Sequence, residues 1–522
     1  MRTVLITTSG IGSRLGEYTE HTNKSLVRVG EKFSICRIID KFDPKTTRFV
    51  ITLGYYGNLV REFLDLAYVN HNFTYVNVDK YQGEGSSLGY SLLQARSELQ
   101  CPFTFFCCDS IIIDDIPDPG PVNVLYVATS DDASSYATIN TNGSSILRVN
   151  SKGEKNFDYV YTGVSHIHDY MYYWYILETK YNANPDDKDL GDVQVLNHLI
   201  NQKAAVVKYK VLSKWFDIGN INSYNATCDY FKCRYNVLYK KDESICFFDD
   251  KVIKFFNNEK KNLDRVKRGH SLGPIVPQIL GNNSHFFSMD LVKGDVLSEY
   301  YVHGEVYNVL KWAQDNLWID KNVDPNHRYT CHKFYFLKTS DRVGELDFGR
   351  EFDTINGVRT GPIRALLNRV DWDAMYTDTF YQFHGDFIMD NIMKTPDSYK
   401  LIDWRQDFGG NLFHGDMYYD LAKFRHNIIF NHLNVDSDLF TLEFEEDGAI
   451  VDLKCNYFLM RQLEDFDKFV AENNLDLKKI KILTALIWIN MAPLHEFKIS
   501  KFLFYFGKYN LRLELGPPVV VL

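Results

Sequence analysis

The chain of 522 residues lacks the features of a membrane or secreted protein. No window approaches the roughly 18 consecutive apolar residues that a membrane-spanning helix needs. The start, MRTVLITTSG, has a single arginine and no small-residue cleavage site, so it predicts the first strand of a fold rather than a signal peptide. The nine cysteines are scattered, odd in number and without a C-x-x-C pair, which supports neither a zinc ribbon nor a disulfide framework. We expect a cytoplasmic protein without membrane insertion.

Acidic residues outnumber basic ones. The formal net charge of −10 argues against a nucleic-acid-binding protein, because such proteins need a basic surface to displace counterions from phosphates. A short basic run, NEKKNLDRVKRGH at residues 258–270, is typical of the solvated face of a helix. His327, Cys331 and His332 could in principle hold a metal, but they lack a second spaced pair, so we interpret them as ordinary loop residues.

No Pro-, Gly- or Ser-rich linker, internal repeat or low-complexity tract divides the chain. At ~100–200 residues per domain its length still predicts several domains, and we work with two. The first, at 1–238, alternates strand and helix patterns. Strands are predicted at 3–8, 48–55, 74–79 and 103–108, and helices at 34–42, 57–67 and 87–99. This order predicts an α/β, Rossmann-like domain with a mostly parallel sheet, covered on both faces, and ligands at the carboxyl ends of its strands.

After about residue 240 the pattern changes. SICFFDDKVIKFF consists of two β runs around the turn Asp249-Asp250 and predicts a hairpin. From Val306 onward helical patterns prevail, for example in NYFLMRQLEDFDKFVAENN and LKKIKILTALIWINM. We therefore predict a second, bilobal α+β domain at 239–522, with a β-rich small lobe at about 239–293 and a helical lobe at about 294–522.

The opening loop, SGIGSRLG, follows the first predicted strand. A lone G-x-G is weak, and a dinucleotide-binding fingerprint would need a further glycine where Arg14 stands. Bare backbone at Gly10 and Gly12 lets amide groups approach phosphate oxygens, and the Arg14 guanidinium can clamp a polyphosphate through two hydrogen bonds. Lys24 adds a second cation about ten residues on. These residues together predict a site for a nucleoside triphosphate.

Residues 1–235 resemble the nucleotidyltransferases that couple sugar phosphates or phosphocholine to NTPs. The family pattern G-x-G-[ST]-R-[LMF], followed by P-K-x-L-[LV]-x-[VI]-G, matches here with Asn23 in place of the usual proline. The resemblance implies that Gly10, Gly12, Ser13 and Arg14 bind the nucleotide, that Arg14 and Lys24 are catalytic, and that Asp109 and Asp217 bind the metal. Either aspartate alone would more simply cap a turn, but their occurrence together with the loop favours the metal site.

The same resemblance extends to two further segments. In EKNFDYVYTG, Glu154, Lys155 and Gly163 correspond to residues that bind the sugar phosphate in family members. Adjacent opposite charges are also common on surfaces, so both interpretations stay open. In YQGEGSSLGYS, Gln82 and Gly85 stand where relatives bind the base, although the spacing differs.

The stretch FHGDFIMDN places Asp386 and Asn391 five residues apart, and KLIDW then supplies Asp403. Phosphoryl transfer needs a carboxylate that accepts the substrate's hydroxyl proton and separate oxygens that bind the metal. The pattern H-x-D-x-x-x-x-N followed by [LIV]-I-D-[WF] resembles the choline kinase and aminoglycoside phosphotransferase family across roughly residues 240–522. It implies that Asp386 is catalytic, that Asn391 and Asp403 are metal ligands, that His384 has a structural role, and that Asp420 braces the catalytic loop.

The predicted small lobe supplies the nucleotide contacts of that resemblance. Lys254, in KVIKFF, stands where the family's strand lysine binds nucleotide phosphates, and SMDLVKGDVL resembles the hinge whose backbone, at Met289 and Leu291, would hold adenine. No Gly-rich loop separates ICFF from KVIK, and the acidic partner of Lys254 is left open between Glu259 and Asp264.

Together, the two halves predict a bifunctional enzyme. One domain would phosphorylate a small alcohol, amino alcohol or sugar with ATP, and the other would transfer a nucleotidyl group from a second NTP, with CTP or UTP favoured. The product would be an activated donor for decorating a surface glycan or lipid. Oxygen ligands predict Mg²⁺, with Mn²⁺ as a substitute. The alternative is that one domain is an inactive binding or scaffold module, and a homo-oligomer is left open.

Overall fold

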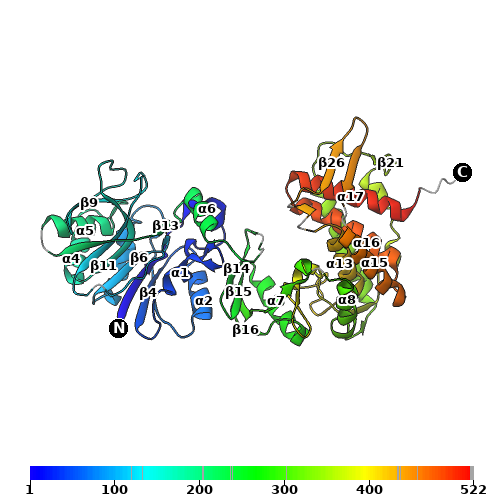
Figure 1. The fold of residues 1–522 in the computed structure, drawn as a ribbon, viewed down its shortest axis with the longest axis horizontal. Helices are drawn as coiled ribbons and strands as arrows, with labels where there is room; N and C mark the ends of the chain where they lie inside the picture. The colour runs from blue at the N-terminus through cyan, green and yellow to red at the C-terminus, as the bar shows by residue number, and fades with distance from the viewer. Residues whose placement is uncertain are drawn as a thin grey trace. The chain divides into compact units, whose positions relative to one another are not determined.

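The computed structural model describes residues 1–522 except 119, 132, 203–204, 236, 238, 301, 432–433, 436, 455–456 and 518–522. Leu238, the predicted last residue of the first domain, and Cys455 lie outside the described residues. The chain forms two compact units: unit 1 is Met1–Asn262 with Leu280–Leu291, and unit 2 is Leu263–Ile279 with Val292–Leu522 (Figure 1). Most of the predicted small lobe thus lies in unit 1. The domain boundary that the sequence predicts at 238/239 stays a prediction.

Unit 1 contains a nine-stranded sheet (Figure 1). Its strand order is β5 (Asn72–Asn77), β4 (Thr47–Leu53), β1 (Arg2–Thr7), β6 (Phe103–Cys107), β11 (Tyr159–Ile167), β8 (Asn123–Ala128), β12 (Val207–Val211), β10 (Ser145–Asn150) and β9 (Thr138–Asn142). The first four strands are mutually parallel. Strand β11 runs antiparallel to both of its neighbours, and β10 pairs with β9 as a hairpin.

The sheet is therefore mixed: β8 and β12 are parallel neighbours and run in the same direction as the first four strands, in agreement with a mostly parallel sheet, whereas β11 and β10 run antiparallel to their neighbours, which was not predicted. The physical reason is the connection between Asn123 and Ile167, where β8, β9, β10 and β11 follow one another without an intervening helix. Parallel neighbours need a long crossover, usually a helix, whereas short connections permit antiparallel pairing. The four predicted strands and the helices at 34–42 and 57–67 are confirmed within three residues at their ends. The largest difference is in the first of these helices, which ends at Ile39.

Helices cover both faces of this sheet, as predicted. On one face lie α1 (Ser34–Ile39) and α2 (Gly57–Ala67), and on the other α3 (Leu88–Gln94), α4 (Tyr170–Ala183) and α5 (Asp192–Asn201). The strands divide their side chains accordingly. Val4 and Ile6 pack with α1 and α2, whereas Leu5 packs with α4 and α5. The buried residues on both faces leave the strand ends as the place for polar side chains.

Short elements at those strand ends carry the candidate site. They are the 3-10 helices η1 (Ser13–Thr19) and η2 (Lys24–Leu26), the strand pairs β2 (Arg28–Val29) with β3 (Lys32–Phe33) and β7 (Ser110–Ile112) with β13 (Trp215–Asp217), and the helix α6 (Ile221–Tyr230). The 3-10 helix η3 (Arg96–Glu98) lies at the opposite end of the strands, where Arg48 of β4 contacts Glu98. In the β7–β13 pair, Asp217 lies opposite Ser110. This register brings Asp217 beside Asp109, more than one hundred residues away in sequence.

The predicted hairpin is confirmed and forms part of a second sheet. This sheet has the order β14 (Glu243–Phe247), β15 (Lys251–Phe256), β17 (Phe286–Asp290) and β16 (Ile279–Asn282). Cys246, Ile253, Phe255 and Phe286 belong to the same buried cluster as Phe63 of α2. Nearby, the Glu62 carboxylate accepts a hydrogen bond from the backbone N–H of His285. The hairpin therefore shares a hydrophobic core with the nine-stranded part of unit 1.

Unit 2 is mostly helical. It contains the larger part of α7 (Glu259–Leu272), then α8 (Glu305–Asn316), α9 (Asn326–Cys331), a π-helical turn (His332–Leu337), α10 (Lys338–Gly344), α11 (Ile363–Leu367), α12 (Trp372–Met375), α13 (Met417–Ile429), α15 (Tyr457–Glu472), α16 (Leu477–Met491) and α17 (Phe497–Leu515). Both quoted helical segments near the C-terminus are confirmed. Among the described residues, no helix is both long and apolar enough to cross a membrane.

Three small sheets complete unit 2. Their strand orders are β18 (Asp295–Val296), β23 (Ile392–Lys394), β24 (Tyr399–Leu401); β19 (Asn322–Val323), β22 (Thr379–Gln382), β25 (His414–Gly415); and β21 (Val358–Arg359), β20 (Thr354–Ile355), β27 (Ala449–Leu453), β26 (Phe440–Phe444). Short 3-10 turns lie at Gly273–Ile275, Leu297–Glu299, Met389–Asn391 and Ala492–Leu494. The stretch FHGDFIMDN, residues 383–391, lies between β22 and β23.

The basic run at 258–270 forms α7, but its prediction as a solvated face is wrong for two arginines. Arg265 and Arg268 are only 8% and 1% exposed. The Arg268 guanidinium donates hydrogen bonds to the main-chain oxygens of Phe383 and Arg405. Carbonyl oxygens remote in sequence thus draw the side chain inward, whereas Lys267, on the opposite face, is mostly exposed.

Candidate functional site

The glycine-rich loop after β1 is shaped by Gly12 and anchored by Asn23. Gly12 has φ of 71°, a left-handed backbone conformation that residues other than glycine rarely adopt. A Cβ at this position would lie 3.0 Å from the Lys24 Cβ. The Asn23 amide donates to the main-chain oxygens of Thr8 at 2.8 Å and Tyr55 at 2.6 Å. Its Oδ1 also accepts from the Ser25 N–H at 2.8 Å. Asn23, where the resembling family has proline, therefore fixes Lys24 beside the loop.

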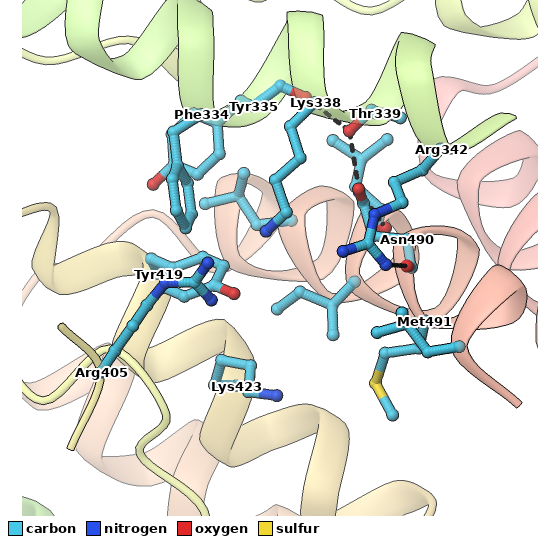
Figure 2. A pocket seen from close by; sticks show the side chains of 14 residues that line it. Phe334, Tyr335, Lys338, Thr339, Arg342, Arg405, Tyr419, Lys423, Asn490 and Met491 are labelled. Atoms are coloured by element: carbon cyan, nitrogen blue, oxygen red, sulfur yellow. Dashed lines mark hydrogen bonds between the residues drawn. The ribbon is translucent and has the colours of Figure 1, made fainter. Parts of the chain in front are cut away.

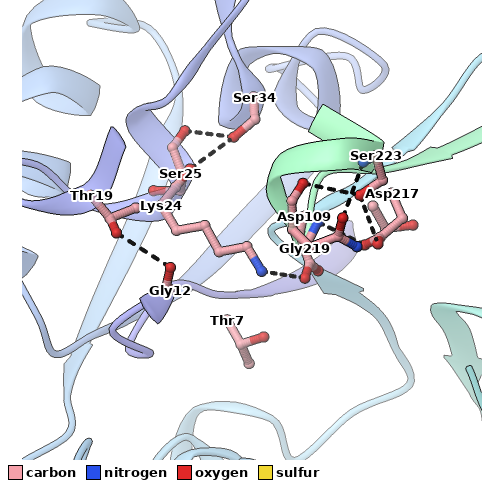
Figure 3. A network of polar contacts seen from close by, with 12 residues as sticks. Thr7, Gly12, Thr19, Lys24, Ser25, Ser34, Asp109, Asp217, Gly219 and Ser223 are labelled. Atoms are coloured by element: carbon pink, nitrogen blue, oxygen red, sulfur yellow. Dashed lines mark hydrogen bonds and ion pairs between the residues drawn. The ribbon is translucent and has the colours of Figure 1, made fainter. Parts of the chain in front are cut away.

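Lys24, Asp109 and Asp217 meet at the carboxyl ends of the strands (Figure 3). The Lys24 ammonium lies 2.5 Å from Asp109 Oδ2. Figure 3 shows Asp217 on the neighbouring segment, close to Asp109, with the lysine on the far side of the pair. The predicted metal ligands and one predicted catalytic cation are thus brought together, from three separate parts of the sequence.

Asp217 is oriented by its own turn. Its Oδ1 accepts a hydrogen bond from the Gly219 N–H at 3.0 Å, and Oδ2 accepts from the Tyr136 hydroxyl at 3.2 Å. A Cβ at Gly219 would lie 2.9 Å from Asp217 Oδ1 and 3.2 Å from an Nη of Arg14. The bare backbone at Gly219 therefore makes room for the carboxylate and the Arg14 guanidinium, which is the fourth predicted group at this place.

The charges of this cluster are unequal. Burial raises the pKa of Asp109, but the Lys24 ammonium outweighs it and the pKa is lowered. Burial and the nearby Asp109 raise the pKa of Asp217. Burial would lower the pKa of Lys24, yet the two carboxylates raise it. Among the described residues Asp217 has no ion pair, so the cluster has one carboxylate balanced by Lys24 and a second one available to a cation.

The other predicted residues of unit 1 are less closely connected. Gln82 is exposed and Gly85 has φ of 73°, both on the loop between β5 and α3. Lys155 is exposed, and Glu154 accepts hydrogen bonds from the backbone N–H groups of Lys155 and Asn156. Gly163 lies in an irregularity of the β11–β8 pairing, where a Cβ would lie 3.1 Å from Cys107 Sγ. Ser13 begins η1 and is also exposed. The roles of these residues stay predictions.

In unit 2 Asp386 and Asn391, both from the stretch FHGDFIMDN, contact each other. The Asn391 side-chain amide donates to the main-chain oxygen of Asp386 at 2.9 Å and to its Oδ2 at 3.2 Å. The other carboxylate oxygen of Asp386 lies 2.8 Å from the Lys423 ammonium. Burial would raise the pKa of Asp386, but Lys423 outweighs it and the pKa is lowered. Asp386 is thus held in its ionised form, which a proton acceptor requires.

The loop is braced from α13, as predicted. Asp420 is fully buried, and its two oxygens accept hydrogen bonds from the backbone N–H groups of His384 at 2.8 Å and Gly385 at 2.7 Å. Burial raises the pKa of Asp420 to about 6 in spite of these bonds. The His384 ring contacts the main-chain oxygen of Ile402 at 2.9 Å, and burial lowers the pKa of His384 to about 4. His384 is therefore a neutral, structural side chain.

Asp403 follows β24 in a left-handed backbone conformation, with φ of 57°, that is uncommon for a residue other than glycine. Its carboxylate forms an ion pair with Arg265 of α7. Sequence reasoning missed Arg265 and Lys423, although both are basic side chains of helices whose apolar patterns were visible. Their roles follow from contacts with residues far away in sequence. Such contacts cannot be predicted from the spacing of residues in a local pattern.

The remaining predicted nucleotide contacts lie on the second sheet of unit 1. Lys254 is on β15, opposite Phe287 of β17 and Ile245 of β14. Met289, on β17, has a side chain only 4% exposed, which leaves its backbone as the polar feature, and the Leu291 N–H donates to the main-chain oxygen of Asp250 at 3.0 Å. Their nucleotide-binding roles stay predictions.

The alternative metal group is not assembled. His327 contacts Asn322 at 2.7 Å and His332 contacts the Tyr376 hydroxyl at 2.9 Å, so separate partners hold the two imidazoles. Cys331 is buried. All eight cysteines among the described residues are free thiols.

Comparisons with known proteins give structural matches alone. No protein-family model matches the chain, and no curated protein does. Its N-terminal part is similar to the solved structure of CTP:phosphocholine cytidylyltransferase from Streptococcus pneumoniae, at 19% identity and a TM-score of 0.39 over 44% of this chain and all of that one. It is also similar to the inositol-1-phosphate CTP transferase from T. maritima, at 17% identity and 0.36 over 46% of this chain and 98% of that one.

A UDP-glucose pyrophosphorylase complexed with UDP-glucose matches at 15% identity and a TM-score of 0.38, over 44% of this chain and 98% of that one. All three identities are below 25% and all three scores below 0.5. The function proposed next therefore rests on the residues of the two sites.

Proposed function

We propose that unit 1 is a nucleotidyltransferase that joins a phosphate-bearing substrate to the nucleotidyl group of an NTP and releases pyrophosphate. The observation that carries this proposal is the convergence of Lys24, Asp109 and Asp217, with Arg14 beside Gly219, at the carboxyl ends of the strands. Two carboxylates and two cations around a glycine loop suit a reaction in which several negative oxygens approach one another.

In this reaction a phosphate oxygen of the substrate attacks the α-phosphorus of the NTP. The bond from the α-phosphorus to the bridging oxygen breaks, and that oxygen leaves with pyrophosphate. Arg14 can hold the β- and γ-phosphates through its planar donor pair. Lys24, held by Asp109, keeps its positive charge close to the reacting phosphorus.

The donor set fits Mg²⁺, because Asp109 and Asp217 offer hard carboxylate oxygens and Gly219 leaves room beside the second one. Bound there, Mg²⁺ or Mn²⁺ would supply charge neutralisation for the triphosphate. Among the described residues no group of three or more His, Cys, Asp or Glu side chains forms a site without substrate. That agrees with a cation that takes some of its ligands from the nucleotide and from water.

We propose further that unit 2 provides the catalytic residues of a small-molecule kinase. The specific observation is the Asp386–Asn391 contact on a loop braced by Asp420. Asp386, kept ionised by Lys423, would accept the proton of the substrate hydroxyl while that oxygen attacks the γ-phosphorus of ATP and ADP leaves. Asn391 and Asp403 supply the oxygen donors that would hold Mg²⁺.

Together these proposals define a bifunctional enzyme. The phosphate ester formed by the kinase is the kind of substrate that the nucleotidyltransferase uses, so the reactions are consecutive, and tethering keeps their amounts equal and raises the local concentration of the intermediate. We also propose that the second NTP is CTP or UTP, and that the product is used to decorate a surface glycan or lipid. The proposed binding roles of Gln82, Gly85, Glu154, Lys155 and Gly163 also belong to this proposal, as do cytoplasmic location and any homo-oligomer.

A mass-spectrometric screen tests both activities. The purified chain is incubated with Mg²⁺, with each NTP in turn, and with either free hydroxyl compounds plus ATP or ready-made phosphate esters. We expect a phosphate ester in the first series and a nucleotidyl ester with pyrophosphate in the second, both stopped by EDTA and restored by Mg²⁺. If a series yields its expected product from none of the acceptors, the corresponding proposal is rejected and a scaffold role is favoured for that unit.

A further inference from the structure

A cavity of about 120 Å³ lies in unit 2 beside the proposed proton acceptor (Figure 2). Four cationic side chains line it: Lys338 and Arg342 from α10, Arg405 from the loop after β24, and Lys423 from α13. Figure 2 shows Lys338 and Arg342 extending from one helix into the cavity, with Arg405 approaching from the opposite side. Lys423 connects the cavity to catalysis, because its ammonium lies 2.8 Å from Asp386.

Three of these cations have no carboxylate partner. Among the residues that the structure describes, no ion pair involves Lys338, Arg342 or Arg405. Lys338 instead lies 4.3 Å from the centre of the Phe334 ring, and the Arg405 guanidinium is 5.1 Å from the same ring. Arg342 donates a hydrogen bond to the main-chain oxygen of Asn490 at 3.2 Å. Each keeps donor groups that are not neutralised by the protein.

The mutual repulsion of these cations is large enough to affect ionisation. The pKa of Lys338 is lowered well below its ordinary value by burial and by the charges of Arg405, Arg342 and Lys423, and Asp386 offsets this only in part. Placing like charges together in a partly buried cavity destabilises the protein unless a ligand compensates them. An anion would do so, whereas a quaternary or primary amine would add to the repulsion.

We infer that the acceptor of unit 2 is a hydroxyl compound that carries its own anionic group, a carboxylate or a phosphate, bound by Lys338, Arg342 and Arg405 while its hydroxyl faces Asp386. This inference rests on the kinase function proposed above and narrows its substrate class. It excludes the amino alcohols that the sequence resemblance admits. The remainder of the cavity wall, which includes Leu483, Leu486 and Ile487, suits a small carbon skeleton.

The first test compares neutral, anionic and cationic acceptors. Glycerol, glycerate and glycerol 3-phosphate form one set, glucose, gluconate and glucose 6-phosphate a second, and choline and ethanolamine a cationic set. ATP-dependent formation of phosphate esters is measured for each by mass spectrometry. We expect turnover to be confined to anionic members. Phosphorylation of neutral or cationic members with equal or higher kcat/KM would overturn the inference.

The second test measures binding apart from turnover. Inorganic phosphate and glycerol 3-phosphate are titrated by calorimetry into the full-length wild type, Arg342→Gln, Lys338→Met and the control Arg364→Gln. Arg364 is exposed on α11 and does not line the cavity, so its variant should behave as wild type. Wild type and control should show a class of sites whose affinity falls at least tenfold in the two cavity variants, while any anion binding by unit 1 should be the same in all four proteins.

The outcomes separate the inference from the function on which it rests. Equal phosphate binding in wild type and in both folded cavity variants would overturn the inference, whatever the activity. A raised KM for ATP with unchanged anion binding would also overturn it, since the cations would then serve the nucleotide. Anion binding as expected, without phosphorylation of any acceptor, would reject the proposed kinase function and leave an anion-binding cavity.

Discussion

Asp217 and Asp109 are the same residue type in two electrostatic settings. Asp109 is balanced by Lys24, whereas Asp217 has only the N–H of Gly219 and hydroxyl groups as partners. Asp217→Asn keeps these contacts nearly isosteric and removes one negative charge from the proposed metal site. We expect nucleotidyl transfer, followed as pyrophosphate release, to fall by about two to three orders of magnitude. Asp229→Asn, an exposed change on α6, is the matched control and should retain full activity.

Arg14 differs from Lys24 in geometry. It approaches the site from the opening loop, and among the described residues no carboxylate is hydrogen-bonded to it, so we propose that its guanidinium binds the leaving pyrophosphate. Arg14→Lys keeps the charge and loses the planar fork, and turnover of nucleotidyl transfer should fall by about one to three orders of magnitude. In a one-pot assay with the free acceptor, ATP and the second NTP, the variant should accumulate the phosphate ester. Similar accumulation by wild type would contradict the coupling of the two reactions.

Lys423 sets the ionisation of Asp386. Burial and Asp403 raise the pKa of Asp386, while Lys423 and His384 lower it, with the net result below its usual value. A base works in its deprotonated form, so kinase activity is lost as pH falls through this pKa. Lys423→Met should raise the pKa and move the acidic limb of kcat/KM upward by about one pH unit or more. Lys311→Met, exposed on α8, should leave the profile unchanged. An unmoved limb in Lys423→Met would show that Asp386 is not the titrating base.

At the scale of elements, one helix positions the proposed catalytic loop. Asp420 and Lys423 are three residues apart on α13, so they project from the same face. The two carboxylate oxygens of Asp420 accept hydrogen bonds from two backbone N–H groups. The amide of Asp420→Asn has only one accepting oxygen, so it would keep one of these bonds and bury its own two N–H donors. We expect kinase kcat to fall by about tenfold to a hundredfold with nucleotidyl transfer intact. A parallel loss of both activities would indicate general unfolding, which a circular dichroism melt would reveal.

Elements also show what the sequence could predict. The strands and helices of residues 1–108, the hairpin at 244–256 and the two catalytic loops follow from local patterns, and the register of β7 with β13 then joined Asp109 to Asp217. The antiparallel strand β11 could not be predicted, because pairing direction depends on connections rather than on the strand's own residues. The buried contacts of Arg268 could not be predicted either, because its partners are main-chain oxygens 115 and 137 positions away.

At the scale of the whole molecule, the second sheet decides where the chain can be divided. Phe255 and Phe286 lie against Phe63 in the core of unit 1, with ring centres of Phe63 and Phe286 5.8 Å apart. A fragment 1–240 would expose this apolar surface of α2. Each buried phenylalanine stabilises by roughly 1.5–3 kcal/mol. Cutting near residue 240, where the pattern of the sequence changes, is therefore expected to destabilise the N-terminal half, for which nucleotidyl transfer is proposed.

Three purified fragments test this expectation: 1–240, 1–292, and 1–292 with Phe286→Ala. We expect 1–292 to be the most soluble and to melt at the highest temperature in calorimetry, and Phe286→Ala to cost about 3–5 kcal/mol, as truncation of a buried phenylalanine does elsewhere. Nucleotidyl transfer to a supplied phosphate ester should survive in 1–292, because Arg14, Lys24, Asp109 and Asp217 all lie within it. A fragment 1–240 that melts as high as 1–292 would show that the second sheet does not stabilise the nine-stranded sheet, and that residues 1–240 fold without it.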